Sequence, residues 1–485
     1  MYDLLVTGDD LASHVAAAYA SRQGLKTLLV AQSGLGGLQI IGDFVFNLDS
    51  APMTGLASGQ PGFSVLAELG VEIPETHPTA VSPAYQVLLP GHRIDFSSDP
   101  DSLLSELAWE FPDREAELRD FYGSAREASS VFQDWIAEHP RIQPQTLKEY
   151  VSYLKIFPFL LQYKFAAARF DRMLSQDAPL EKVWEAQQAL LSLNTDDLFS
   201  FASAFQYSAP LRGVAYFPQG KQFLFNAMIR TLEEGGGLYL SGHSITSVAR
   251  HNTITLEVKA PDGSLFQATG RHWIVSTKSD ALSLLEANRS HVMFSERLRP
   301  ARIVGYPFTL FLGVAEKSLP EQMARHIAVV TDVHKDLYDH NVILLETGLP
   351  EKEKPLFQAK NFVTATVYLP AEDDVWTGEA LRQEAASIME RLDGFFPFLK
   401  DGIELYDLDK SIELSLNYRK VLSPKYKVRN AFFTSFAAKS DRTRLKNVFL
   451  TGASLLTDAG FDAELLSGKN AAMQVIEERK FSNGT

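Results

Sequence analysis

The sequence contains no cysteine. Disulfide bonds, a thiolate nucleophile and a cysteine-ligated metal are therefore excluded, and redox chemistry would need a bound cofactor. The first residues carry no basic segment and begin an apolar run at once, so we expect no secretory signal peptide. No apolar run approaches the about 20 residues of a membrane-spanning helix. These absences predict a cytoplasmic protein.

Positive charge is also scarce, because 46 Lys and Arg stand against 60 Asp and Glu, for a net charge of -14. Such a surface argues against a nucleic-acid partner, since phosphate binding needs basic residues. The motifs H-E-x-x-H, G-x-S-x-G and G-K-[ST] are missing, which removes zinc hydrolases, serine hydrolases and nucleoside triphosphatases. We predict no metal site and assign no catalytic residue.

The amino end of the chain has the pattern of a βαβ unit. Residues 2–7 are apolar, Gly8 begins a turn, residues 11–22 are an alanine-rich helix and residues 25–30 are a second apolar run. Neither run alternates with polar residues, which is typical of the buried strands of a parallel sheet. The amino end of the helix in such a unit offers unpaired N–H groups and a partial positive charge to the pyrophosphate of a dinucleotide.

The dinucleotide fingerprint at this turn is incomplete. It requires G-x-G-x-x-G, and this chain reads Gly8-Asp9-Asp10-Leu11-Ala12-Ser13. Asp10 stands where a glycine would let the backbone approach the pyrophosphate, and it brings bulk and like charge there. Two unit charges 4 Å apart near a protein surface interact by about 4 kcal/mol. At the end of the second strand, Ala31 or Gln32 replaces the acidic residue that would hold the ribose.

Further segments carry a resemblance to a known family. The glycine turn of residues 34–37 is followed by the F-V-F-N-L-D-S-A-P-M-T-G segment of residues 44–55. The segment 216–221 reads Y-F-P-Q-G-K, and the carboxyl end contains N-V-F-L-T-G-A-S at 447–454 and A-G-F-D-A-E-L-L-S-G-K-N-A-A at 459–472. Together with the βαβ unit, these motifs resemble the phytoene desaturase branch of the FAD-dependent amine oxidase superfamily, over nearly the whole chain.

The resemblance implies an α/β fold, with a discontinuous doubly wound FAD/NAD(P)-binding Rossmann-like domain and an α+β substrate domain with a helical insertion. We expect the dinucleotide-binding-like domain in residues 1–75, 210–280 and 440–485. Residues 76–209 are expected to form a hairpin and the helical insertion, and residues 281–439 the sheet and helices of the substrate domain.

The resemblance also implies FAD as the cofactor, if any is bound, and indicates where it would lie. In relatives an Arg follows the Gly-Gly pair near the flavin phosphates, and Leu38 stands there in this chain. The acidic residue that holds the ribityl chain is replaced by Ala453. The predicted cofactor positions are Gly8, Asp10, Ser13, Gln32, Gly36, Gly37, Leu38, Ile245 (backbone, near the adenine), Gly452 and Ala453. Four departures of ~1.5 kcal/mol each would remove more than about four decades of affinity.

Two functions follow from this resemblance. One is an FAD-dependent oxidoreductase of desaturase, isomerase or amine oxidase type acting on an elongated apolar substrate, in which the flavin takes the hydride and no acid–base pair is needed. The other is a relative with an eroded FAD site that binds an isoprenoid, a polyene, another lipid or a protein, as the Rab GDP-dissociation inhibitors of this superfamily illustrate.

In both cases we predict an apolar pocket between the sheet of residues 306–368 and the helices of residues 145–205. Its candidate wall residues are Phe157, Phe159, Phe165, Phe308 and Phe311. The run Ile156–Leu161 is open to three interpretations, namely core packing around Pro158, a wall of the pocket, and a peripheral contact with a membrane surface.

Overall fold

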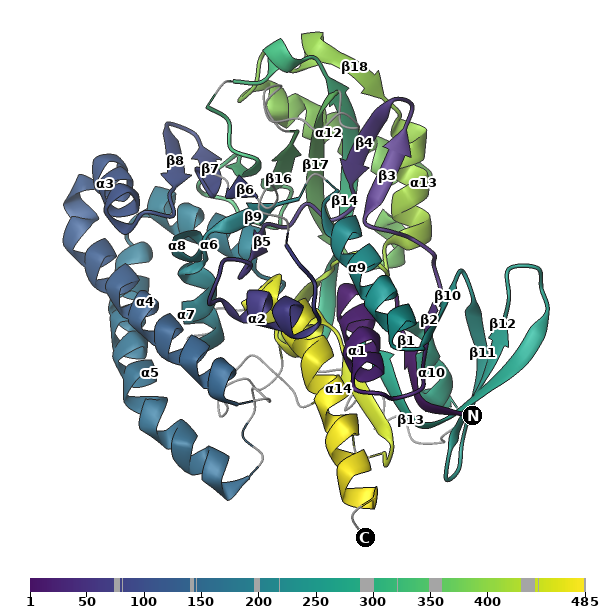
Figure 1. Cartoon of the computed structure of the whole chain (residues 1–485). Coiled ribbons are helices and arrows are strands. Elements are labelled where there is room, and N and C mark those ends of the chain that lie inside the picture. The colour runs from purple at the N-terminus through teal and green to yellow at the C-terminus, as the bar shows by residue number, and fades with distance from the viewer. Residues whose placement is uncertain are drawn as a thin grey trace.

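The computed structural model describes residues 1–73, 79–80, 82–139, 144, 146–195, 201–217, 219–287, 301–320, 322–348, 360–428, 441–443 and 445–483. Figure 1 shows a helical lobe beside two sheets, one near the amino terminus and one above it.

The first sheet is built on parallel strands in the order β10-β2-β1-β13-β20. Their bounds are β1 (Tyr2–Thr7), β2 (Thr27–Ala31), β10 (Leu238–Ser241), β13 (Leu265–Ser276) and β20 (Val448–Thr451). The strand β12 (Ile254–Lys259) pairs antiparallel with the first half of β13, and β11 (Ser244–Arg250) pairs antiparallel with β12. The α/β fold class is confirmed, and strands from the beginning, middle and end of the chain meet in this one sheet.

Helices cover both faces of this sheet. On one face, Leu4 and Val6 of β1 share a core with alanines of α1 (Leu11–Arg22) and α14 (Asp462–Asn483). On the other face, Leu5 shares a core with Leu282 of α10 (Asp280–Ala287). Adjacent residues of β1 therefore face opposite cores, which explains why the strand is apolar throughout. The predicted domain boundaries remain a prediction.

The second sheet is mixed, with the order β18-β14-β17-β16-β15-β7-β8 and with β19 paired to β14. Its strands are β7 (Tyr85–Leu89), β8 (His92–Phe96), β14 (Ala301–Val314), β15 (His326–Val330), β16 (Val342–Thr347), β17 (Asn361–Pro370), β18 (Ile403–Tyr406) and β19 (Lys425–Val428). The hairpin β7–β8 precedes the helical insertion in the sequence and joins this sheet through β15. Helix α12 (Gly378–Asp393) packs on one face, and α6 (Ala178–Leu191) on the other.

The helical lobe comprises α3 (Pro100–Glu110), α4 (Glu115–Glu138), α5 (Leu147–Leu174), α6 and α7 (Phe201–Tyr207). Its core is aromatic, because Phe121 of α4 lies within 6.0 Å, between ring centroids, of Phe170, Trp184 and Tyr207. Helix α5 begins at a capping box in which Thr146 and Glu149 satisfy each other's backbone N–H groups.

The remaining short elements connect these parts. They are β3 (Leu38–Ile41) paired with β4 (Phe44–Asn47), the small sheet β5 (Met53–Thr54), β9 (Val214–Tyr216) and β6 (Thr79–Ala80), and the helices α2 (Pro61–Glu68), α8 (Ala209–Arg212), α9 (Lys221–Glu234) and α13 (Leu408–Tyr418). Helix α9 packs beside α1 and brings its first turn close to the glycine turn of residues 34–37.

Candidate functional site

The turn after β1 is closed by the side chain of Asp10. This residue caps α1, and its Oδ1 accepts hydrogen bonds from the backbone N–H of Ser13 at 3.0 Å and from the Ser13 hydroxyl at 2.5 Å. Its Oδ2 accepts a third bond, at 2.5 Å, from the hydroxyl of Ser276 at the end of β13. Asp is a favoured N-cap because its carboxylate satisfies a free N–H of the first turn. A donor that would otherwise face a pyrophosphate is thus bound to the chain itself.

The end of β2 is held in the same way. Asp9 Oδ1 accepts hydrogen bonds of 2.7 Å from both the backbone N–H and the hydroxyl of Ser33. Burial raises the pKa of Asp9, although these bonds oppose the shift. The neighbouring Gln32 accepts a 2.9 Å bond from the hydroxyl of Ser279. The polar side chain at the predicted ribose position, Gln32, and the neighbouring Ser33 are therefore both engaged within the protein.

The glycine turn is filled from α9. The backbone N–H of Gly37 donates to Gln222 Oε1 at 2.7 Å. A Cβ on Gly37 would lie 2.5 Å from the backbone nitrogen of Gln222, so only glycine permits this close approach. Leu38 begins β3 and is half-buried.

At the carboxyl end, Gly452 lies beside Asp10. Its φ of +130° is a conformation that favours glycine, and a Cβ there would lie 2.6 Å from Thr277 Oγ1 and 3.4 Å from Asp10 Oδ2. Ala453 follows, with only 2% of its surface exposed. Gly8, Asp10, Ser13 and Gly452 are thus brought together, whereas Ile245 is buried in the core on the α10 face of the sheet.

The five phenylalanines predicted to line one pocket are not brought together. Phe308 is fully buried in the core shared with α12. Phe311 belongs to another cluster, 5.3 Å from Phe46 between ring centroids. Phe157, Phe159 and Phe165 lie on the solvent side of α5, with 36%, 36% and 69% of their surface exposed. The five residues therefore belong to two cores and one surface.

A buried charge cluster lies where the two sheets and the helical lobe meet. Lys221 Nζ donates to Asp49 Oδ2 at 2.7 Å and to Glu464 Oε1 at 2.8 Å, and Asp49 also accepts a 2.8 Å bond from Ser423. Burial alone would raise the pKa of Asp49, but Lys221 holds it well below its usual range. In the sequence Lys221 is only the last residue of the Y-F-P-Q-G-K segment, and the carboxylates come from distant segments without a recognisable pattern.

Lys425 adds a second cation to this cluster. Its Nζ donates to the carbonyl oxygens of Ala189 at 2.6 Å and Ser192 at 2.5 Å. Burial lowers the pKa of Lys425 to about 7, although Asp49 opposes this shift. A cavity of about 40 Å³ lies here, between Leu344 and Tyr368 of the second sheet and the segment after α6. This cavity occupies the region of the predicted apolar pocket, but charged and polar groups contribute to its lining.

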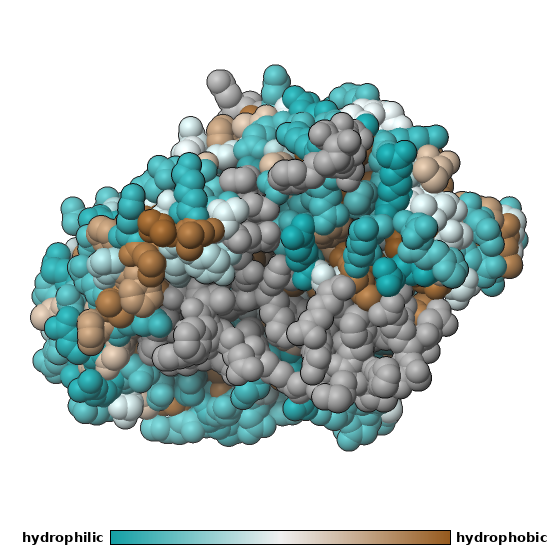
Figure 2. Space-filling view, turned by 90° about the horizontal axis from the view of Figure 1, so that it is seen from below, coloured by the Kyte–Doolittle hydropathy of each residue, from teal (hydrophilic) through white to brown (hydrophobic). Residues whose placement is uncertain are grey.

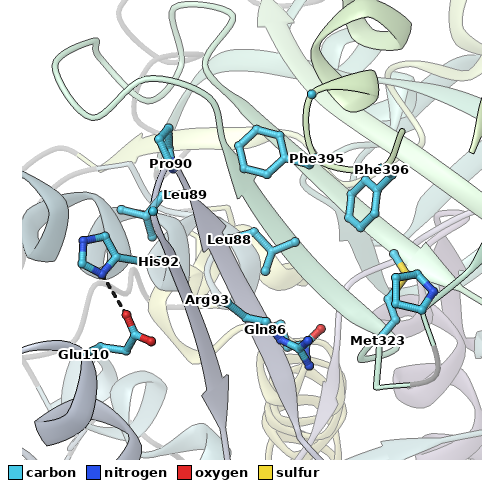
Figure 3. A pocket seen from close by; sticks show the side chains of 13 residues that line it. Gln86, Leu88, Leu89, Pro90, His92, Arg93, Glu110, Met323, Phe395 and Phe396 are labelled. Atoms are coloured by element: carbon cyan, nitrogen blue, oxygen red, sulfur yellow. Dashed lines mark hydrogen bonds and ion pairs between the residues drawn. The ribbon is translucent and has the colours of Figure 1, made fainter. Parts of the chain in front are cut away.

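A larger cleft of about 730 Å³ opens beside the turn of the β7–β8 hairpin. Figure 3 shows Phe395 and Phe396, from the turn after α12, on one side of Leu88, and the His92–Glu110 pair on the other side. The ring of His92 bonds Glu110 at 2.8 Å through Nδ1. Arg93 also lines the cleft, and its Nη2 donates to the backbone oxygen of Gln322 at 2.8 Å. The cleft thus combines an apolar wall with a polar rim.

Among the described residues, no helix has both the length and the hydropathy needed to cross a membrane. Within the same ranges, no three His, Asp or Glu side chains are grouped as ligands of a metal ion would be.

The comparisons with known proteins identify the fold. No protein family and no curated protein matches the sequence. Among solved structures, an oxidoreductase from Methanosarcina mazei is similar with a TM-score of 0.59 at 13% identity, over 98% of this chain and 99% of that one. Cyclohexylamine oxidase from Brevibacterium oxydans is similar with a TM-score of 0.58 at 11% identity, over 99% of both chains. A protein from Pyrococcus furiosus is similar with a TM-score of 0.54 at 13% identity, over 98% of this chain and 97% of that one. The chain therefore has a fold similar to that of the Methanosarcina mazei oxidoreductase and of cyclohexylamine oxidase.

Proposed function

We propose that this chain is a phytoene desaturase-like protein that binds an elongated apolar ligand, such as an isoprenoid, a polyene or another lipid, and whose FAD site is eroded. The observation that carries the proposal is the occupancy of the backbone donors. The backbone N–H of Ser13 donates to the side chain of Asp10, and that of Ser33 donates to the side chain of Asp9. The backbone N–H of Gly37 donates to the side chain of Gln222.

The residues at this site do not fit FAD. A pyrophosphate at the amino end of α1 would have to displace the Asp10 carboxylate from three hydrogen bonds and then lie beside its negative charge. A phosphate at the glycine turn would have to displace Gln222. Ala453 offers the ribityl chain no polar side chain. These costs fall on different parts of one extended ligand and therefore roughly add.

The cleft beside the β7–β8 hairpin supports the proposed binding of an apolar ligand. Its volume of about 730 Å³ lies within the range of small-molecule sites, roughly 300–1,000 Å³. Leu88, Met323, Phe395 and Phe396 give it apolar walls, and Arg93 and His92 provide polar contacts at its rim. Such a site suits an apolar molecule with one polar end better than a sugar or a nucleotide.

The alternative is an active FAD-dependent oxidoreductase with non-standard anchoring of the cofactor. The observation that favours it is the glycine at position 452, because a residue without a side chain lets the backbone lie directly beside Asp10. In this alternative the backbone, rather than side chains, would hold the phosphates.

Absorption spectroscopy of the purified protein tests whether FAD is bound, and mass spectrometry tests whether an apolar ligand is bound. We expect no stoichiometric visible flavin band, before or after incubation with FAD and dialysis. We also expect lipid extraction to recover an isoprenoid or acyl compound. One retained flavin per chain would contradict the eroded site and favour the alternative. An extract without apolar compounds, together with no binding of added polyenes or fatty acids, would contradict the ligand.

A further inference from the structure

Helix α5 is apolar on two opposite faces. The inner face is buried in the helical lobe through Tyr153, Leu160, Tyr163 and Phe170. Eight large apolar side chains of α5 have 36–82% of their surface exposed, and these are Leu147, Tyr150, Val151, Leu154, Phe157, Phe159, Leu161 and Phe165. Figure 2 shows hydrophobic side chains gathered on the side of the molecule where the helical lobe lies. We call this set, without Phe159, the outer stripe.

The outer stripe follows the helical repeat. Its members are spaced three or four residues apart, apart from the adjacent pair Tyr150 and Val151, so they lie along one side of the helix, whereas Phe159 lies off that line. From Leu147 to Phe165 the stripe is about 27 Å long at 1.5 Å per residue. A continuous apolar ridge of this length on a single helix is unlike scattered surface residues, and it indicates a contact surface.

The charged residues along the stripe are mostly basic. Between Leu147 and Phe165 the helix contains Lys148, Lys155 and Lys164 against one acidic residue, Glu149, which is engaged in the capping box with Thr146, although the whole chain has a net charge of -14. Lys148 and Lys155 are both exposed and lie seven residues apart, on the same flank of the stripe. On the neighbouring α4, Asp120 pairs with Arg169 at 2.9 Å and Glu127 accepts a 3.0 Å bond from Gln162. Two of the nearest carboxylates are therefore engaged with α5.

We propose that the outer stripe of α5 docks on the surface of a lipid bilayer that contains anionic lipids. An amphipathic helix lying in a membrane interface buries Phe and Leu at the boundary of the acyl chains and places Lys at the headgroups. The outer stripe with Lys148 and Lys155 has this arrangement. A bilayer can bind such a ridge without a surface of complementary shape. Within the run Ile156–Leu161, Ile156 and Leu160 pack in the core, whereas the exposure of Phe157 and Leu161 supports peripheral membrane contact.

The cysteine-free sequence allows a site-specific test in the full-length protein. Phe165→Cys is labelled with an environment-sensitive fluorophore, and Phe398→Cys, at a residue that is 73% exposed near the end of α12, provides the matched control. With vesicles of phosphatidylcholine and phosphatidylglycerol, we expect a blue shift and quenching by acyl-chain spin labels at position 165 but not at 398. Equal responses at both positions, or none at either, would overturn the proposal.

A second experiment distinguishes a bilayer from another copy of the chain. We expect Leu154→Ser/Phe165→Ser to lower the vesicle partition coefficient by more than about tenfold, with Phe398→Ser unchanged. All three proteins should have the same mass in light scattering without vesicles and the same thermal unfolding. A wild-type dimer that becomes monomeric in the double variant would assign the stripe to self-association and overturn the proposal. The same follows if wild-type protein does not cosediment with vesicles.

Discussion

The carboxylate of Asp10 accepts a 2.5 Å hydrogen bond from the hydroxyl of Ser276, which lies 266 residues further along the chain. This bond ties the turn after β1 to the end of β13, at the edge of the sheet where a dinucleotide would lie in this fold. A ligand phosphate would normally connect these elements through its oxygens. In this protein a side-chain carboxylate forms the same kind of contact, so the edge is stabilised without a ligand.

Replacing Asp10 by glycine is expected to increase the affinity for FAD more than any other single change at the site. The substitution removes both the bulk and the negative charge beside the pyrophosphate position, and a gain of roughly a hundredfold follows if about 3 kcal/mol of repulsion is removed. The loss of the N-cap should lower the free energy of unfolding by about 1 kcal/mol. Fluorescence titration with FAD and urea denaturation measure the two effects.

Asp10→Asn is the matched control, because it keeps a capping side chain and removes only the charge. A gain in both variants would assign the effect to charge, and a gain in Asp10→Gly alone would assign it to bulk. We expect Ala453→Asp to help less, since it adds one contact without relieving repulsion. If Asp10→Gly binds FAD no better than the wild type, the backbone of the turn has diverged in shape and the charge argument is wrong.

Gln222→Ala is expected to add to the effect of Asp10→Gly. Gln222 blocks the N–H of Gly37, which is far from Asp10 in sequence and belongs to a different part of the cofactor site. Because the two residues share no hydrogen-bond partner, their effects on the binding free energy should add within about 0.5 kcal/mol. A double-mutant cycle of FAD affinities tests this. A large interaction free energy between the two substitutions would mean that the turn at Asp10 and the glycine turn change conformation together.

The fold was predictable because its signals are local. Two apolar runs, a glycine turn and an alanine-rich helix lie within thirty residues, and each specifies its own element before tertiary contacts form. The closure of the site was not predictable. Asp10 is visible in the sequence as a departure from the fingerprint, but Ser33 and Ser276, which donate to Asp9 and Asp10, are common residues without a motif. Nothing in the sequence indicates that a hydroxyl 266 residues away reaches the same turn.

Helix α5 shows a different limit of the sequence. Its apolar residues lie on both faces, so the pattern indicates a helix without indicating which face the protein buries. The resemblance predicts Phe157, Phe159 and Phe165 in the wall of a pocket, but in the structure Leu160 and Tyr163 occupy the buried face and these three are exposed. Only the packing of α4 against α5 decides between the faces, and that depends on contacts between distant residues.

Lys221→Met is expected to destabilise the protein strongly. The change leaves the buried carboxylate of Glu464 and the half-buried carboxylate of Asp49 without their shared cation, and the loss of one partner of a buried pair typically costs about 3–5 kcal/mol. Lys182→Met is the control, because Lys182 is also largely buried but pairs with the partly exposed Glu185. Urea denaturation of both variants measures the difference. Equal and small losses in the two variants would mean that the Lys221 cluster is hydrated rather than dry.

His326 and Glu346 are expected to give the protein opposing dependences of stability on pH. They face each other across β15 and β16, and both are buried. Burial, reinforced by Arg325, lowers the pKa of His326 to about 3. Burial raises the pKa of Glu346 to about 7, against the attraction of Arg325 and a 2.5 Å hydrogen bond from Asn47. The folded state therefore holds His326 neutral and Glu346 protonated under mildly acidic conditions.

The two groups oppose each other between about pH 4.5 and 6.5. In this window the unfolded chain binds a proton on His326 that the folded chain does not, so this group makes stability rise with pH. The folded chain holds a proton on Glu346 that the unfolded chain has lost, so this group makes stability fall with pH.

Glu346→Gln removes only the contribution of Glu346. We expect its unfolding free energy to rise more steeply with pH than that of the wild type, by up to about 1.4 kcal/mol per pH unit. His326→Gln should change the slope in the opposite direction. Urea denaturation at intervals across this window measures the slopes, and the contributions of other carboxylates cancel in the comparison. Identical slopes in the wild type and Glu346→Gln would show that Glu346 is ionised in the folded protein.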